Sequence, residues 1–165
     1  MAAAPAVLAG NPRVRFVFIG DGILRDRILA EAERLGVRHA LLLTGLVPPG
    51  RIPELLGALD AVVHPSLREG LARVLPQALI VGRPAISYDV DGAREVVRPE
   101  TGILLAPRDV AGLAAAILRL AADPELRAAM GREGRRRFAD RFRHETMTDQ
   151  LRSLYLRVLG STGQG

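Results

Sequence analysis

The chain has 165 residues and contains no cysteine, tryptophan or lysine. Without cysteine there can be no disulfide bond and no thiolate metal site, and a reducing compartment is permitted. The three histidines, His39, His64 and His144, do not follow a metal-ligand spacing. No apolar run reaches the length of a membrane span, and the apolar start of the chain lacks the basic stretch of a signal peptide. We therefore expect a cytoplasmic protein that binds no metal.

Aromatic residues are also scarce, at 4% of the chain, whereas all 23 basic residues are arginine and the formal net charge is +5. Without stacking aromatics or a helix-turn-helix pattern, this charge does not indicate binding to nucleic acid. It is either a solvated surface or a means of attracting phosphorylated ligands and anionic lipids. The densest part comprises Arg135, Arg136, Arg137, Arg141 and Arg143. This part fits either a solvated basic face or peripheral contact with an anionic membrane.

Short apolar segments alternate with helical patterns along most of the chain. Strands are expected over residues 14–19, 40–44, 61–63, 85–87 and 103–105, and helices over 1–10, 24–35, 52–59, 73–81, 93–97, 110–122, 125–137 and 145–159. Strands that are apolar nearly throughout are typical of a parallel sheet covered on both faces. The alternation predicts an α/β fold with a doubly wound, Rossmann-like parallel sheet.

The carboxyl-terminal part of the chain carries two further signals. Asp109 is a suitable N-cap for the helix over 110–122. The helix over 145–159 is amphipathic, and such a helix would normally cover the domain. The end of the chain is polar and glycine-rich, so we expect one domain over residues 1–160 and a disordered tail over 161–165.

The stretch over residues 64–92 has the pattern of a strand, a loop, a helix and a second strand. In such a unit the loop opens onto a ligand crevice, and free N–H groups at the start of the helix suit an anion. Glu69 lies just before the expected helix, and Gln77 lies on it eight positions later. Together they would hold the phosphates and sugar hydroxyls of one ligand. The alternatives are a capping acid for Glu69 and a solvent-facing residue for Gln77.

The segment PSLREGLARVLPQALIVGRPAISYDVDGAREVV resembles the donor-binding signature of family-four retaining glycosyltransferases, which have the GT-B fold. That signature has two acidic residues separated by seven others, after proline-serine and before a helix that ends in glycine-x-proline. Glu69 matches the first acidic position, and Gln77 stands where the family usually has glutamate. The resemblance extends over about residues 14–158 and implies the C-terminal, donor-binding domain of such an enzyme.

The resemblance assigns roles to the loop and helix of this signature. In the family, the residue at the position of Glu69 faces the transferred sugar, and it is our candidate catalytic residue. Backbone N–H groups of Gly70, Leu71 and Ala72 would bind the phosphates, with an ordinary turn as the alternative for the glycine. Arg73 would meet a phosphate in the same way as Arg68, although both arginines also fit a plain surface position.

Further donor-binding positions follow from the resemblance. Gly20 and Gly22 would line the nucleotide cleft, although a tight turn explains them equally well. Thr44 and Leu46 would flank the base, mainly through backbone groups. Gln77 would hydrogen-bond the ribose, and we expect weaker donor binding because a neutral bond has about half the strength of a charge-assisted one. The pair Asp91-Gly92 either lines the cleft or forms a turn.

We therefore expect the donor-binding part of an enzyme that moves a sugar from a nucleotide-sugar to an acceptor, with no cofactor and no metal. The resemblance implies an N-terminal acceptor-binding domain that this chain lacks. It also implies a missing first strand and a missing arginine–lysine pair for the diphosphate, so activity of this chain alone is doubtful. The rival hypotheses are a non-catalytic module that binds a nucleotide or nucleotide-sugar, and an interaction domain without a ligand.

Overall fold

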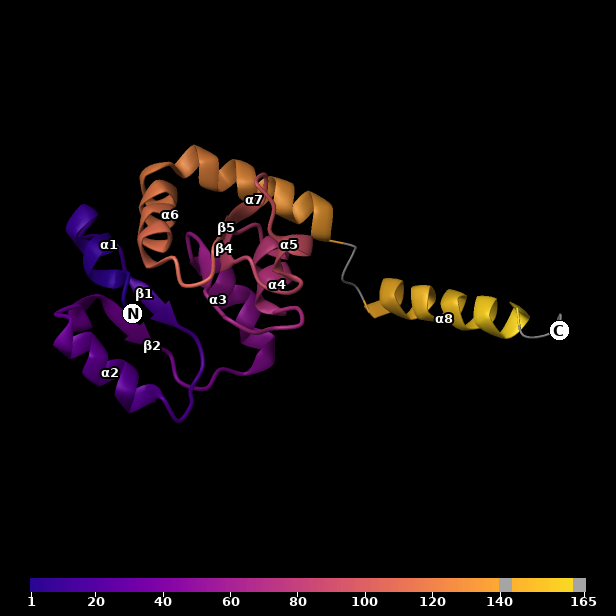
Figure 1. Cartoon of the computed structure of the whole chain (residues 1–165), viewed down its shortest axis with the longest axis horizontal. Helices are drawn as coiled ribbons and strands as arrows, with labels where there is room; N and C mark the ends of the chain where they lie inside the picture. Colours follow the sequence, from indigo (N-terminus) through magenta and orange to yellow (C-terminus); the bar gives the residue numbers. More distant parts are fainter. Residues whose placement is uncertain (140–143, 162–165) are drawn as a thin grey trace.

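The computed structural model describes residues 1–139 and 144–161, in which five strands alternate with six α-helices and two further helices follow (Figure 1). In chain order they are α1 (Ala4–Gly10), β1 (Phe16–Phe18), α2 (Arg25–Arg34), β2 (Leu41–Leu43), α3 (Ile52–Ala58), β3 (Val62–His64), α4 (Val74–Ile80), β4 (Ala85–Tyr88), α5 (Ala93–Val96), β5 (Gly102–Leu105), α6 (Val110–Ala122), α7 (Pro124–Phe138) and α8 (His144–Ser161). Every strand and helix expected from the sequence is present, with ends shifted by a few residues at most.

All strand pairs are parallel, which confirms the expected α/β fold. Strand β1 pairs with β2, and β3, β4 and β5 form a second ladder in that order. Among the described residues no ladder joins the two groups, so the hydrogen bonding of the sheet is interrupted between β1 and β3. Side chains bridge the interruption, because Ile19, just after β1, packs against the buried cluster that contains Val62 of β3.

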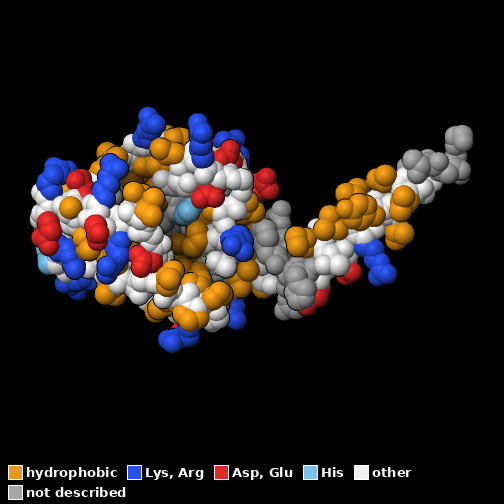
Figure 2. All heavy atoms as spheres, turned by 90° about the horizontal axis from the view of Figure 1, so that it is seen from below, with side chains coloured by type: hydrophobic (Ala, Val, Ile, Leu, Met, Phe, Trp, Pro, Cys, Tyr) orange, Lys and Arg blue, Asp and Glu red, His pale blue; other side chains and the backbone are white. Residues whose placement is uncertain are grey.

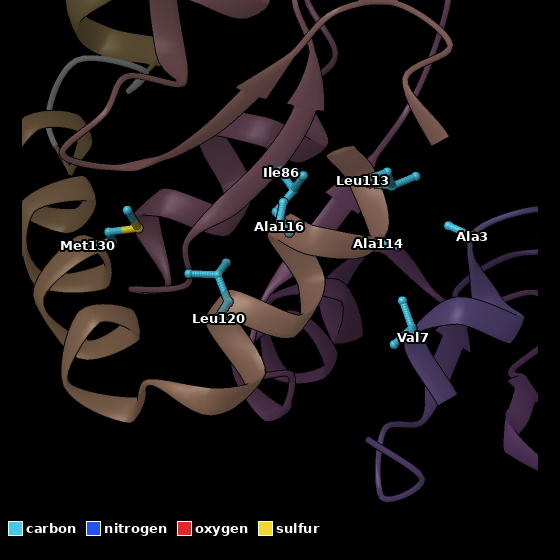
Figure 3. Close-up of a cluster of buried hydrophobic side chains, with 8 residues drawn as sticks. All are labelled: Ala3, Val7, Ile86, Leu113, Ala114, Ala116, Leu120 and Met130. Carbon is cyan, nitrogen blue, oxygen red and sulfur yellow. The ribbon is translucent and has the colours of Figure 1, made fainter. Parts of the chain in front are cut away.

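Helices cover both faces of the central strand β4, all four residues of which are buried. Ile86 points to one face, where it packs in a cluster with Val7 of α1, Leu113 and Leu120 of α6 and Met130 of α7 (Figure 3). Ala85 points to the other face and packs with residues of α4 and α5. This alternation is what a doubly wound sheet requires. Because the paired strands are parallel, their carboxyl ends lie along one edge of the sheet.

Helix α8 contradicts the expectation that it covers the domain. It extends away from the body of the molecule (Figure 1), and Leu151, Leu154 and Tyr155 on its apolar side are 47%, 48% and 65% exposed. The periodicity correctly predicted a helix with an apolar stripe, but such a pattern does not say what the stripe contacts. The helix ends at Ser161, and residues 162–165 of the expected tail lie outside the described part.

The basic stretch at the end of α7 is partly neutralised by acidic residues. Glu133 accepts hydrogen bonds from Arg136 at 2.7 and 2.8 Å and from Arg137 at 2.5 Å. These bonds, from Arg136 first and then Arg137, lower the pKa of Glu133 to about 2. Arg137 also lies 3.4 Å from Glu100. Two arginines of the stretch, Arg141 and Arg143, lie outside the described residues.

None of the helices in the described part combines the length and the hydrophobicity that crossing a bilayer requires.

Candidate functional site

The loop between β3 and α4 carries Glu69 and is fastened to the loop that follows β4. The backbone N–H of Glu69 donates a hydrogen bond of 2.8 Å to Oδ2 of Asp91. The backbone N–H of Gly92 donates a hydrogen bond of 2.9 Å to the carbonyl oxygen of Gly70. Because β3 and β4 are parallel neighbours, these two bonds tie adjacent loops together at the carboxyl ends of the strands. They hold the backbone of Glu69 in place.

Glycine is required at position 92 by this close approach. A Cβ atom there would lie 2.7 Å from the carbonyl oxygen of Gly70. The φ angle of Gly92 is −77°, which any residue can adopt, so the requirement is steric rather than conformational. The neighbouring Asp91 has a φ of +46°, a region that aspartate tolerates better than most residues. The pair Asp91-Gly92 forms a turn, one of the two alternatives that the sequence left open, and this turn is bonded to the loop after β3.

The carboxylate of Glu69 meets a histidine that the sequence analysis did not single out for this role. Nε2 of His64 lies 3.3 Å from Oε1 of Glu69, and the two side chains are 28% and 42% exposed. His64 is the last residue of β3, and its carbonyl oxygen accepts a 3.0 Å bond from the buried hydroxyl of Ser87 on β4. The sequence could have indicated this contact only through the position of His64 at the end of an expected strand, five residues before Glu69.

Three backbone N–H groups next to Glu69 have no acceptor within the described residues. They belong to Gly70, Leu71 and Ala72. Helix α4 begins only at Val74, with Arg73 as its N-cap, so these groups lie in the loop rather than in the first turn of the helix. Gly70 and Leu71 are exposed, whereas Ala72 is buried. An anion beside this loop could therefore accept hydrogen bonds that the protein itself does not use.

The predicted glycine and threonine positions come together at the carboxyl ends of β1 and β2. The N–H of Gly20 donates to Oγ1 of Thr44 at 3.3 Å, and Gly20 bridges Gly45. Gly20 has a φ of +121°, which favours glycine over any other residue. Gly22 donates its N–H to the carboxylate of its neighbour Asp21. Leu46 is 85% exposed, so it presents an apolar surface beside this junction.

Two of the predicted residues, Gln77 and Arg73, form no hydrogen bond or ion pair with the Glu69 carboxylate. Both side chains are exposed, and neither lines the two hollows described below. Gln77 follows Glu69 by eight positions, but the first part of that interval is loop rather than helix. Gln77 therefore lies on the exposed surface of α4.

Two adjoining hollows lie at this edge of the sheet, and Figure 2 shows the hollowed face with a histidine side chain inside it. The inner hollow leaves only about 10 Å³ and is lined by His64, Ser66, Glu69, Ala72, Leu75, Ser87, Val90 and Ala93. The outer one is an open crevice of about 760 Å³, lined by Ser66, Leu67, Arg68, Val90, Pro107 and Arg108. Within residues 1–139 and 144–161 there is no group of three or more histidine, aspartate or glutamate side chains suited to a metal ion.

The chain is similar to solved structures of glycosyltransferases. The chain superimposes on sucrose-phosphate synthase from Thermosynechococcus elongatus with a TM-score of 0.87 and 27% identity, over 97% of this chain and 42% of that one. It also matches Alr3699/HepE from Anabaena in complex with UDP-glucose, with a TM-score of 0.84 and 25% identity over 94% of this chain and 44% of that one. The fold is that of a GT-B glycosyltransferase domain.

The sequence comparison leads to the same class. The family model for glycosyl transferases group 1 matches residues 1–137. The 2-deoxystreptamine N-acetyl-D-glucosaminyltransferase of Streptomyces fradiae is 36% identical over 115 residues, which are 70% of this chain and 27% of that enzyme. This chain belongs to the glycosyltransferase group 1 family. It spans less than half the length of each of these relatives.

Proposed function

We propose that this chain binds a nucleoside diphosphate sugar and is the donor-binding part of a retaining glycosyltransferase. The single observation that carries the proposal is the loop after β3. It fixes Glu69 by a backbone bond to Asp91 and leaves the N–H groups of Gly70, Leu71 and Ala72 without acceptors in the described chain. A carboxylate beside unused donors suits a ligand that carries hydroxyls next to phosphates.

Each part of the donor has a partner of matching chemistry. The diphosphate accepts hydrogen bonds from the free N–H groups of the loop, which already lie in place before the ligand arrives. Such preorganised donors stabilise the charge that develops on a departing diphosphate. The sugar lies beside Glu69, whose carboxylate accepts hydrogen bonds from its hydroxyls. The nucleoside lies over the junction of Gly20 and Thr44 and against the exposed Leu46.

The relatives support the same ligand class. HepE from Anabaena, which is 25% identical to this chain, forms a complex with UDP-glucose. The Streptomyces relative is named for the transfer of an N-acetylglucosaminyl group. We propose that the whole protein transfers a sugar to an acceptor with retention of configuration and without a metal, and that a second, acceptor-binding domain completes it.

Gln77 favours a second candidate function, a module that binds the nucleotide-sugar without turnover. The amide keeps an acceptor for a ribose hydroxyl but lacks the charge of a carboxylate. Because a neutral hydrogen bond contributes less than a charge-assisted one, the donor would be held less firmly. The Gln77→Glu variant separates the two functions. Tighter binding without turnover, measured with the acceptor domain supplied, favours the module.

Calorimetric titration of the chain with UDP, GDP and ADP tests the donor site. We expect saturable binding of one of the three, because the base is selected by the loops after β1 and β2 whereas the diphosphate is common to all. Uridine, guanosine and adenosine serve as controls, and the nucleoside should bind at least about tenfold more weakly than its diphosphate. Failure of a folded chain to bind any diphosphate would contradict the proposal.

A further inference from the structure

The outer crevice lies on the side of Glu69 away from the proposed nucleoside position. Its walls come from the loops that follow β3, β4 and β5, which carry Arg68, Val90 and Arg108 respectively. Strand β4 occupies one edge of β3, so β1 and β2 lie beyond the other edge (Figure 1). The proposed position of the base therefore lies outside this crevice.

The crevice adjoins the small hollow at Glu69. Ser66 and Val90 line both spaces, so a group in the crevice lies next to a sugar held by the carboxylate. The crevice measures about 760 Å³ and is open to solvent, whereas the inner hollow leaves about 10 Å³. The crevice therefore has room for a substrate group that continues beyond the transferred sugar, whereas the inner hollow does not.

Two arginines give this crevice its charge. Arg68 comes from the loop after β3 and Arg108 from the loop after β5, on different walls. Within the described residues neither guanidinium forms an ion pair or a side-chain hydrogen bond, whereas the nearby Arg94 is held by both oxygens of Asp89 at 3.0 Å. A guanidinium group can donate two parallel hydrogen bonds to a phosphate or carboxylate group. An anion between the walls could therefore accept hydrogen bonds from both arginines.

The backbone of Arg108 adds a second observation. Its φ is +65°, in the left-handed region that a long side chain seldom occupies. In the described part of the chain only Asp91, which follows Val90, shares a positive φ among residues other than glycine. Arg108 lines the crevice, whereas Asp91 directly follows Val90, which lines it. Backbone strain of this kind concentrates at ligand-binding positions, because a surrounding structure must hold it.

We propose that the crevice is an anion subsite in which Arg68 and Arg108 hold a phosphate or carboxylate group beside the transferred sugar. The anion is carried either by the acceptor or by the sugar itself. The inference rests on the proposed donor site for its role in the reaction, but the binding of an anion can be measured independently of that site.

The first arm of the test titrates inorganic phosphate into the chain after it is saturated with the nucleoside diphosphate that binds best. We expect phosphate to bind, and Arg68→Gln and Arg108→Gln each to weaken it about fivefold or more, because each removes a charged donor pair. Arg132→Gln, an exposed arginine on α7, is the matched control and should leave binding unchanged. This outcome establishes the anion subsite, and the second arm decides which substrate carries the anion.

The second arm compares the glucuronate and glucose derivatives of the same nucleoside diphosphate. Tighter binding of the glucuronate, lost in Arg68→Gln and Arg108→Gln, assigns the anion to the sugar. The proposal is overturned if neither variant changes either measurement, or if the nucleotide displaces phosphate competitively. If no nucleotide binds, the proposed donor site is contradicted. Phosphate is then titrated into the free chain and into the Arg68→Gln and Arg108→Gln variants, and weaker binding by the variants would still support the anion subsite.

Discussion

Replacing Glu69 by glutamine is expected to weaken binding of the nucleotide-sugar by about 10- to 100-fold, because a hydrogen bond to a charged group contributes about 1.5–3 kcal/mol. The corresponding nucleoside diphosphate should lose less than about threefold, since its phosphates meet backbone N–H groups that the substitution leaves in place. Glutamine keeps the shape of the side chain and its reach toward His64. Calorimetric titration with both ligands measures the difference.

The ratio of the two losses is the informative quantity. Glu125→Gln, which removes an exposed carboxylate in the first turn of α7, is the matched control and should change neither affinity. An equal loss for the sugar nucleotide and the plain nucleotide would show that Glu69 supports the loop rather than the sugar. No loss for either would remove Glu69 from the site.

Replacing Gly92 by alanine is the second change for which we expect a large effect. The new Cβ would lie 2.7 Å from the carbonyl oxygen of Gly70, closer than such atoms approach in proteins. The loop after β3 must therefore move, and the bond from the N–H of residue 92 to Gly70 is strained or lost. Because the free N–H groups for the diphosphate lie on this loop, we expect binding of the nucleoside diphosphate to weaken about tenfold or more.

The stability of the variant separates a local shift from general unfolding. Crowding of this kind costs about 1–3 kcal/mol of folding free energy, which urea denaturation measures. Gly57→Ala is the matched control, because a Cβ there has no neighbour within 4 Å, and it should leave ligand binding intact. Unchanged nucleotide affinity in a folded Gly92→Ala chain would contradict the role given to this contact.

Helix α6 shows what the sequence predicts reliably. Its bounds, Val110–Ala122, are those expected, and Oδ1 of Asp109 accepts a 2.7 Å bond from the N–H of Gly112. Every residue in that signal lies within one turn of the chain, so local patterns suffice. The short strands were also predicted from local patterns, because strands that are buried on both faces are apolar nearly throughout.

The loop after β3 shows what local patterns miss. The bond from Glu69 to Asp91 spans 22 positions and exists only because β4 lies beside β3. The sequence analysis identified Glu69 as the candidate catalytic residue but not His64 as its neighbour. His64 has no metal-ligand spacing and belongs to no motif that would have indicated this contact. The exposure of the apolar side of α8 was not predicted either, because an apolar stripe does not show which surface it packs against.

The most direct test of the donor site follows the backbone amides by NMR while the nucleoside diphosphate is added to ¹⁵N-labelled chain. We predict saturable shifts that are largest at Gly70, Leu71 and Ala72, whose N–H groups have no acceptor among the described residues. Smaller shifts should appear at Gly20 and Thr44. Saturable binding with the largest shifts elsewhere, and none at these three amides, would contradict the account.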